Sequence, residues 1–146
     1  MSPHENAKAN PSYREVCTGS TGHVEVLNVV LANEDATIFE ELVKFTFMFH
    51  DPTTLNRQGN DSGTQYASVI FCSDTQQQEI AKKVMAELQT AMDQKKVTSY
   101  SESKINTGIV PYTKYYPAEQ EHQQYLEKNP SGYCNHRYRF REWPVV

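Results

Sequence analysis

Segments with a strand-like apolar pattern alternate with segments of helical pattern along this chain. Residues 23–32 form an apolar run with partial alternation, which is typical of a buried strand. Over residues 80–92 an apolar side chain recurs at every fourth position, which indicates an amphipathic helix. Strands separated by helices predict an α/β (α+β) two-layer sandwich, and 146 residues suffice for one domain.

Two helix starts are indicated by side chains that can bond free backbone N–H groups. Thr37 and Glu40 have the spacing of a capping box, and Asp74 with Gln77 resembles a second start. The first helix should end before Pro52. Its apolar residues at helical spacing are Ile38, Leu42, Phe45 and Phe49. Further expected elements are strands over 66–72 and 105–116, a short helix over 119–126 and a turn at 129–132.

Charge and cysteine content exclude several classes of protein. Fourteen Lys and Arg residues against eighteen Asp and Glu residues give a net charge of −4, which excludes a strongly basic nucleic-acid binder. No apolar run approaches the roughly 18 residues of a membrane span, and residues 1–10 lack the apolar core of a secretory signal. The three cysteines, Cys17, Cys72 and Cys134, are an odd number in a chain too long to need a disulfide scaffold, so they are expected to be thiols of a cytoplasmic protein, with Cys72 packed in the core.

Several polar residues could carry chemistry, and each has a plainer interpretation. His23 and Glu25 share one face of the expected strand, where a carboxylate is either solvent-exposed or paired and functional. The polar segment 56–66 could position a substrate or simply be a solvated loop. His122 and Tyr125 should share one face of a short helix. Neither Cys-x-x-Cys nor His-Glu-x-x-His occurs, so no metal site is expected.

Five motifs, in this order, resemble the peptide methionine sulfoxide reductase A family. They are Pro11-Ser12-Tyr13-Arg14-Glu15-Val16-Cys17, Thr21-Gly22-His23-Val24-Glu25, His50-Asp51-Pro52-Thr53, residues 56–66 (Asn-Arg-Gln-Gly-Asn-Asp-Ser-Gly-Thr-Gln-Tyr), and residues 122–126 with 128–130 and 132–134. The resemblance implies a ferredoxin-like core with a mixed sheet and flanking helices. It also implies reduction of methionine-S-sulfoxide, in proteins or free, by a cycle of thiol, sulfenic acid and disulfide.

The resemblance assigns a role to each matching residue. Glu25 would protonate the sulfoxide oxygen, Tyr13 and Tyr66 would be hydroxyl donors to it, Asp61 would order nearby water, and Cys134 would be the resolving thiol. Tyr13, Tyr66, His122 and Tyr125 would bind substrate. No cofactor is implied beyond thioredoxin or another thiol as reductant, no nucleic acid or membrane partner is expected, and the folded chain should be a monomer.

The sequence departs from the family pattern at its beginning. The family's nucleophilic cysteine lies in a Gly-Cys-Phe-Trp-Gly motif, which does not occur here. We therefore expect a disordered or loop-like segment over 1–10, a reductase-like domain over 11–134 that lacks the family's first strand and helix, and a divergent basic and aromatic tail over 135–146. Three interpretations stay open: a shortened, inactive reductase, a non-catalytic binder of oxidised methionine, and a non-functional fragment of low stability.

Overall fold

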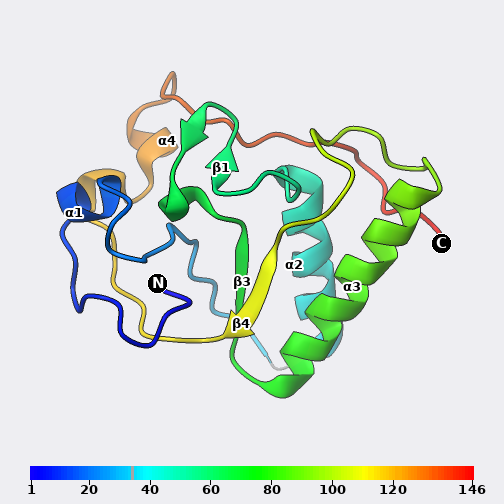
Figure 1. Cartoon of the computed structure of the whole chain (residues 1–146), viewed down its shortest axis with the longest axis horizontal. Coiled ribbons are helices and arrows are strands. Elements are labelled where there is room, and N and C mark those ends of the chain that lie inside the picture. The colour runs from blue at the N-terminus through cyan, green and yellow to red at the C-terminus, as the bar shows by residue number, and fades with distance from the viewer. Residues whose placement is uncertain (34) are drawn as a thin grey trace.

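The computed structural model describes residues 1–33 and 35–146 and has a mixed α/β architecture, as predicted (Figure 1). Its elements are α1 (Tyr13–Cys17), α2 (Ala36–Phe49), β1 (Arg57–Gln58), β2 (Asp61–Ser62), the 3-10 helix η1 (Thr64–Tyr66), β3 (Val69–Cys72), α3 (Thr75–Asp93), β4 (Gly108–Pro111), the 3-10 helix η2 (Gln120–His122) and α4 (Tyr125–Lys128). The strands form two two-stranded sheets, with β1 antiparallel to β2 and β3 parallel to β4.

The hydrophobic core lies between α2, α3 and the β3–β4 pair. Figure 1 shows the two long helices side by side, next to the two strands. Phe47 of α2, Val84 and Leu88 of α3 and Cys72 of β3 are almost completely buried there. None of the helices among the described residues is both long and apolar enough to cross a membrane.

The start of α3 follows the prediction. The Asp74 carboxylate accepts a hydrogen bond of 2.8 Å from the Gln77 N–H, which satisfies one of the free donors at the helix start. The buried face includes Val84 and Leu88, with Ala81 and Ala91 beside them. The helix is therefore amphipathic in the predicted register.

The prediction for α2 was wrong in its cap, and the apolar residues noted at helical spacing are not the ones that become fully buried. Asp35, not Thr37, is the N-cap, and its carboxylate accepts a hydrogen bond of 2.9 Å from the Thr37 N–H. Glu40 forms ion pairs with lysines instead of capping. The buried residues are Phe39, Val43 and Phe47, whereas Ile38 and Phe45 are exposed. Two adjacent stripes of this helix are apolar. Packing against α3 buries the stripe with Phe39, Val43 and Phe47 and leaves Ile38 and Phe45 exposed.

The strand expected over residues 23–32 is also wrong, because this segment belongs to no sheet. Leu27 and Val30 are each 87% exposed. A strand needs backbone hydrogen bonds to a neighbouring strand as well as an apolar sequence pattern, and no strand among the described residues pairs with this segment. The strands expected over 66–72 and 105–116 are present in shorter form, as β3 and β4.

The C-terminal segments differ from their expected forms in two respects. The helix expected over 119–126 is split into η2 and α4, since Gln124 has a left-handed backbone with φ of 53°. The turn at 129–132 is confirmed by a hydrogen bond of 2.8 Å from the Gly132 N–H to the Asn129 carbonyl. The segment 135–146 packs along the helices, where the Arg139 N–H donates to the Met48 carbonyl and Trp143 packs on the core.

Candidate functional site

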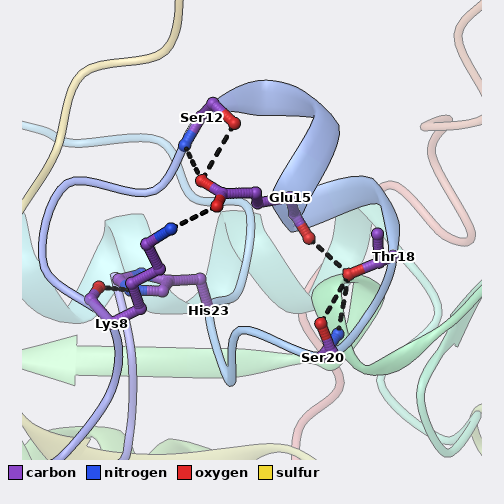
Figure 2. Close-up of polar contacts among 6 residues, drawn as sticks. All are labelled: Lys8, Ser12, Glu15, Thr18, Ser20 and His23. Atoms are coloured by element: carbon purple, nitrogen blue, oxygen red, sulfur yellow. Dashed lines mark hydrogen bonds and ion pairs between the residues drawn. The ribbon is translucent and has the colours of Figure 1, made fainter.

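The short helix α1 is held by a polar network around Glu15 (Figure 2). The Glu15 carboxylate accepts hydrogen bonds from the Ser12 N–H at 2.9 Å and from the Ser12 hydroxyl at 3.0 Å, and it pairs with Lys8. The hydrogen bond from Lys8, followed by those from Ser12, lowers the pKa of Glu15 to about 2. This network fixes the helix that carries Tyr13. The Ser-x-x-Glu spacing is a helix-start signal that our sequence analysis did not use.

The end of α1 is tied to the segment that carries Tyr66. The Thr18 hydroxyl donates a hydrogen bond of 2.6 Å to the Glu15 carbonyl, as Figure 2 shows. The Thr64 hydroxyl donates a hydrogen bond of 2.8 Å to the carbonyl of Gly19, whose φ of 71° suits glycine. Tyr13 on α1 and Tyr66 at the end of η1 are therefore held near each other.

A backbone hydrogen bond holds Glu25 next to the segment that carries Tyr66. Its N–H donates a hydrogen bond of 2.9 Å to the carbonyl of Gln65, the residue before Tyr66. His23, two residues earlier, is buried, and its Nε2 donates to the Lys8 carbonyl at 2.8 Å. The expectation that His23 and Glu25 share one face is wrong, since Glu25 is exposed to solvent and His23 is not.

Charge effects link Glu25, Tyr13, Tyr66 and Asp61 to one another. Partial shielding of the carboxyl by surrounding atoms raises the pKa of Glu25, nearby Asp61 raises it further, and His122 acts in the opposite direction. Burial, then Glu25 and Asp61, raises the pKa of Tyr66. The Cys17 thiol raises the pKa of Tyr13 most, and Glu25 and Tyr66 add to this effect. The arrangement places a carboxyl with a raised pKa close enough to two tyrosine hydroxyls for their charges to interact.

The two remaining predicted substrate-binding residues, His122 and Tyr125, have different neighbours in the structure. The His122 ring stacks on the Tyr13 ring with 4.3 Å between centroids, so His122 joins the cluster. The Tyr125 ring instead lies against Gly132. The shared helix face predicted for His122 and Tyr125 is wrong, because the left-handed Gln124 interrupts the helix between them.

Cys134 lies on the wall of the same cavity as Glu25, Asp61 and Tyr66. The side-chain amide of the next residue, Asn135, donates to the Gln58 carbonyl at 2.6 Å and to the Asp61 carboxylate at 2.8 Å. Asn135 therefore anchors the chain next to Cys134 to Asp61 and to the Gln58 backbone. Sequence reasoning missed this contact, which joins positions 74 residues apart and has no local signal.

The three cysteines are free thiols in different surroundings. Cys17 and Cys134 are exposed. Cys72 is 1% exposed, and burial raises its pKa to about 11, which confirms the prediction of a packed core thiol. No cluster of three or more His, Cys, Asp or Glu residues suited to a metal ion occurs in the described part of the chain.

Comparison with known proteins decides the family. The family model described as "Peptide methionine sulfoxide reductase" matches residues 4–144. The chain belongs to this family. A probable peptide methionine sulfoxide reductase of Schizosaccharomyces pombe is 46% identical over 138 residues, which are 94% of this chain and 75% of that protein. The reductase MsrA of Vibrio parahaemolyticus is 49% identical over 125 residues, which are 86% of this chain and 56% of that one.

Solved structures of peptide methionine sulfoxide reductases have the same fold. Methionine sulfoxide reductase A of Corynebacterium diphtheriae superimposes with a TM-score of 0.74 at 41% identity, covering 88% of this chain and 61% of that chain. Reduced Mxr1 of Saccharomyces cerevisiae superimposes with a TM-score of 0.70 at 37% identity, covering 90% and 69%. The chain thus spans roughly half to three quarters of the length of these relatives.

Proposed function

We propose that this domain supplies the proton donors and the recycling thiol of a peptide-methionine (S)-S-oxide reductase. The substrate would be methionine-S-sulfoxide, in proteins or as the free amino acid. The observation that carries the proposal is the cluster of Glu25, Tyr13, Tyr66 and Asp61, in which the pKa of Glu25 is raised. A carboxyl that keeps its proton closer to neutral pH suits a general acid.

The reaction begins when a cysteine thiolate attacks the sulfur of the sulfoxide. Glu25 donates a proton to the sulfoxide oxygen, and the Tyr13 and Tyr66 hydroxyls bond to that oxygen. The sulfoxide gains two electrons and becomes a thioether, while the attacking cysteine takes the oxygen and becomes a sulfenic acid. Cys134 then attacks the sulfenic sulfur, which forms a disulfide and releases water. A dithiol such as thioredoxin reduces this disulfide and becomes oxidised itself.

The position of Cys134 supports its role as the thiol that recycles the attacking cysteine. Cys134 is exposed, so a protein dithiol could reach it, and the next residue, Asn135, bonds to Asp61. Thioredoxin as the reductant, a monomeric state and a cytoplasmic location are parts of the proposal. The family resemblance puts the attacking cysteine in a Gly-Cys-Phe-Trp-Gly segment, which is absent from these 146 residues.

The test supplies that segment. A family-type first strand with Gly-Cys-Phe-Trp-Gly is fused upstream of Asn10, and consumption of the separate S and R epimers of a methionine sulfoxide peptide is followed with dithiothreitol. We expect the fusion to consume the S epimer only. A fusion with cysteine replaced by serine in the added motif is the control. A folded fusion that binds the S epimer without turnover would favour the non-catalytic binder, and one that does neither would refute the proposal.

A further inference from the structure

The Cys134 thiol has a histidine beside it. Its Sγ lies 3.9 Å from Nδ1 of His136, a contact that a thiol, as a weak donor, can make to an unprotonated ring nitrogen. Both side chains are exposed, so a reagent or a partner dithiol can reach the pair. A thiol next to an imidazole is the arrangement in which a base activates a sulfur nucleophile.

The backbone places the two side chains together. Residues 132–138 contain no helix, strand or turn, and in an extended chain alternate side chains lie on the same side. Asn135, between the pair, bonds instead to β1 and β2. The Arg137 N–H donates a hydrogen bond of 3.1 Å to the Phe49 carbonyl at the end of α2. Figure 1 shows the chain after α4 running past β1. The segment is therefore held on both sides of His136.

The imidazole is also held by an aromatic contact that does not use Nδ1. The His136 ring stacks on the Phe49 ring, with 6.1 Å between centroids and 15° between planes. This stack orients the imidazole and leaves its Nδ1 to the thiol. A phenylalanine ring at position 136 would keep the stack and lack the nitrogen, so it can separate the packing of His136 from its chemistry.

The surroundings keep this imidazole neutral at neutral pH. Partial shielding of the ring by surrounding atoms lowers the pKa of His136, Arg139 lowers it further, and Asp61 acts in the opposite direction. His50, at the end of α2, also faces this ring, but burial lowers its own pKa to about 4, so it is uncharged. A neutral imidazole can accept a proton, whereas an imidazolium cannot.

We propose that His136 is the proton acceptor of the Cys134 thiol when this thiol forms a disulfide. The inference rests on the proposed function, in which the Cys134 Sγ bonds to the sulfenic sulfur while the S–O bond of that sulfur breaks. His136 takes the thiol proton at Nδ1 and gives it to the departing hydroxide, which leaves as water. The thiol sulfur is oxidised and the sulfenic sulfur is reduced, so this step needs no further reductant.

The first test uses the 146-residue chain and needs no reductase activity. Alkylation of Cys134 and Cys17 by iodoacetamide is timed separately between pH 6.5 and 8 by mass spectrometry of peptides. A thiol without a base reacts as its thiolate, so its rate rises about tenfold per pH unit below an ordinary pKa of about 8.5. If neutral His136 takes the proton, the Cys134 rate should rise less than about threefold per unit over this range.

Two histidine variants separate chemistry from packing. His136→Phe should slow the alkylation of Cys134 at pH 6.5 at least about tenfold and restore the tenfold rise per pH unit, while Cys17 keeps its rate. His4→Phe is the matched control, because His4 is an exposed histidine of another segment, and it should change neither thiol. A Cys134 rate and pH profile that His136→Phe leaves unchanged would overturn the proposal.

Free imidazole gives a readout that packing alone would not produce. In His136→Ala, added imidazole at pH 6.5 should raise the alkylation rate of Cys134 at least about threefold more than that of Cys17. Equal acceleration of the two thiols would count against a base at position 136.

The second test uses the fusion that carries Gly-Cys-Phe-Trp-Gly. His136→Phe should slow formation of the disulfide at least about tenfold and leave the preceding single-turnover reduction of the S epimer unchanged. Disulfide formation at the same rate in both fusions would overturn the proposal. An inactive fusion would count against the proposed function, whereas loss of the flat alkylation profile prediction in the 146-residue chain would count against the role of His136 alone.

Discussion

Replacing Asp51 by asparagine should strongly destabilise the fold. Asp51 is 2% exposed and accepts four hydrogen bonds. Two come from the Thr53 N–H at 3.0 Å and hydroxyl at 2.5 Å, and two come from the Ser101 N–H at 3.0 Å and hydroxyl at 2.8 Å. This carboxylate therefore joins the chain after α2, which leads to Asp61 and Tyr66, to a segment 50 residues away.

The magnitude follows from what asparagine can still accept. Its carbonyl oxygen can keep the Thr53 pair, but its amide would then face the Ser101 donors without accepting from them. A buried donor that loses its partner costs about 1–3 kcal/mol. Because Ser101 is exposed, water can satisfy part of this loss. We expect the free energy of unfolding to fall by about 2–4 kcal/mol, a large share of the roughly 5–15 kcal/mol that a domain possesses.

Urea denaturation followed by circular dichroism at 10 °C measures this change. Asp93→Asn is the control, because Asp93 is an exposed carboxylate that accepts a single hydrogen bond from Gln89, and it should change stability by at most about 0.5 kcal/mol. Similar effects of Asp51→Asn and Asp93→Asn would refute the reasoning.

The same carboxylate should make stability depend on pH. Burial alone would raise the pKa of Asp51, but the hydrogen bonds from Thr53 and Ser101 outweigh it and hold the pKa below the ordinary value of 3.8. A folded-state pKa below the unfolded one gives stability that is present above pH 3.8 and is lost as the pH falls through the folded pKa. The difference between the unaltered chain and Asp51→Asn should therefore shrink below about pH 4.

Three further outcomes are expected. Iodoacetamide at pH 8 should modify Cys17 and Cys134 but spare Cys72 in the folded chain, as measured by mass spectrometry of peptides. Reaction of Cys72 as fast as the other two cysteines would contradict its burial. Trp143→Ala should lower the free energy of unfolding by about 1–3 kcal/mol, because Trp143 packs on the core. Val145→Ala should not lower it, because that side chain is 87% exposed. Equal urea midpoints of the two variants would contradict the packing described for residues 135–146. The 146-residue chain alone should not reduce methionine-S-sulfoxide above background in a chromatographic assay with dithiothreitol, and thiol-dependent turnover would show that Cys17 or Cys134 can attack the sulfoxide.

Local signals predicted the parts of the fold that depend on neighbours in sequence. The Asp74 cap and the buried face of α3 follow from spacing alone, and both were predicted. For α2, two apolar stripes competed, and only contact with α3 selects Phe39, Val43 and Phe47. The short helix α1 was missed even though the Ser12 and Glu15 spacing marks its start.

Contacts between distant segments could not be predicted from pattern. The apolar run 23–32 has the composition of a strand, but it forms none in the structure. Strand formation also needs a neighbouring strand to pair with, and the local sequence does not show whether one is present. The resemblance predicts that Tyr13, Glu25, Asp61 and Tyr66 act together, and this stays a prediction; in the structure Glu25 raises the pKa of Tyr13 and of Tyr66, and Asp61 raises the pKa of Glu25 and of Tyr66. The role of Asn135 in holding Asp61 depends on tertiary packing and had no counterpart in the sequence analysis.

The reaction rate of Glu25→Gln in the fusion that carries Gly-Cys-Phe-Trp-Gly tests the account most directly. An amide cannot give a proton to the sulfoxide oxygen, so single-turnover reduction of the S epimer should slow by about 10²–10⁴-fold. Tyr13→Phe alone should cost less, because Tyr66 still offers a hydroxyl. Since a general acid acts in its protonated form, the rate of the unaltered fusion should also fall as the pH rises through the pKa of Glu25. A folded fusion whose rate is indifferent to Glu25→Gln would contradict the assignment of Glu25 as the acid and, with it, the proposed site.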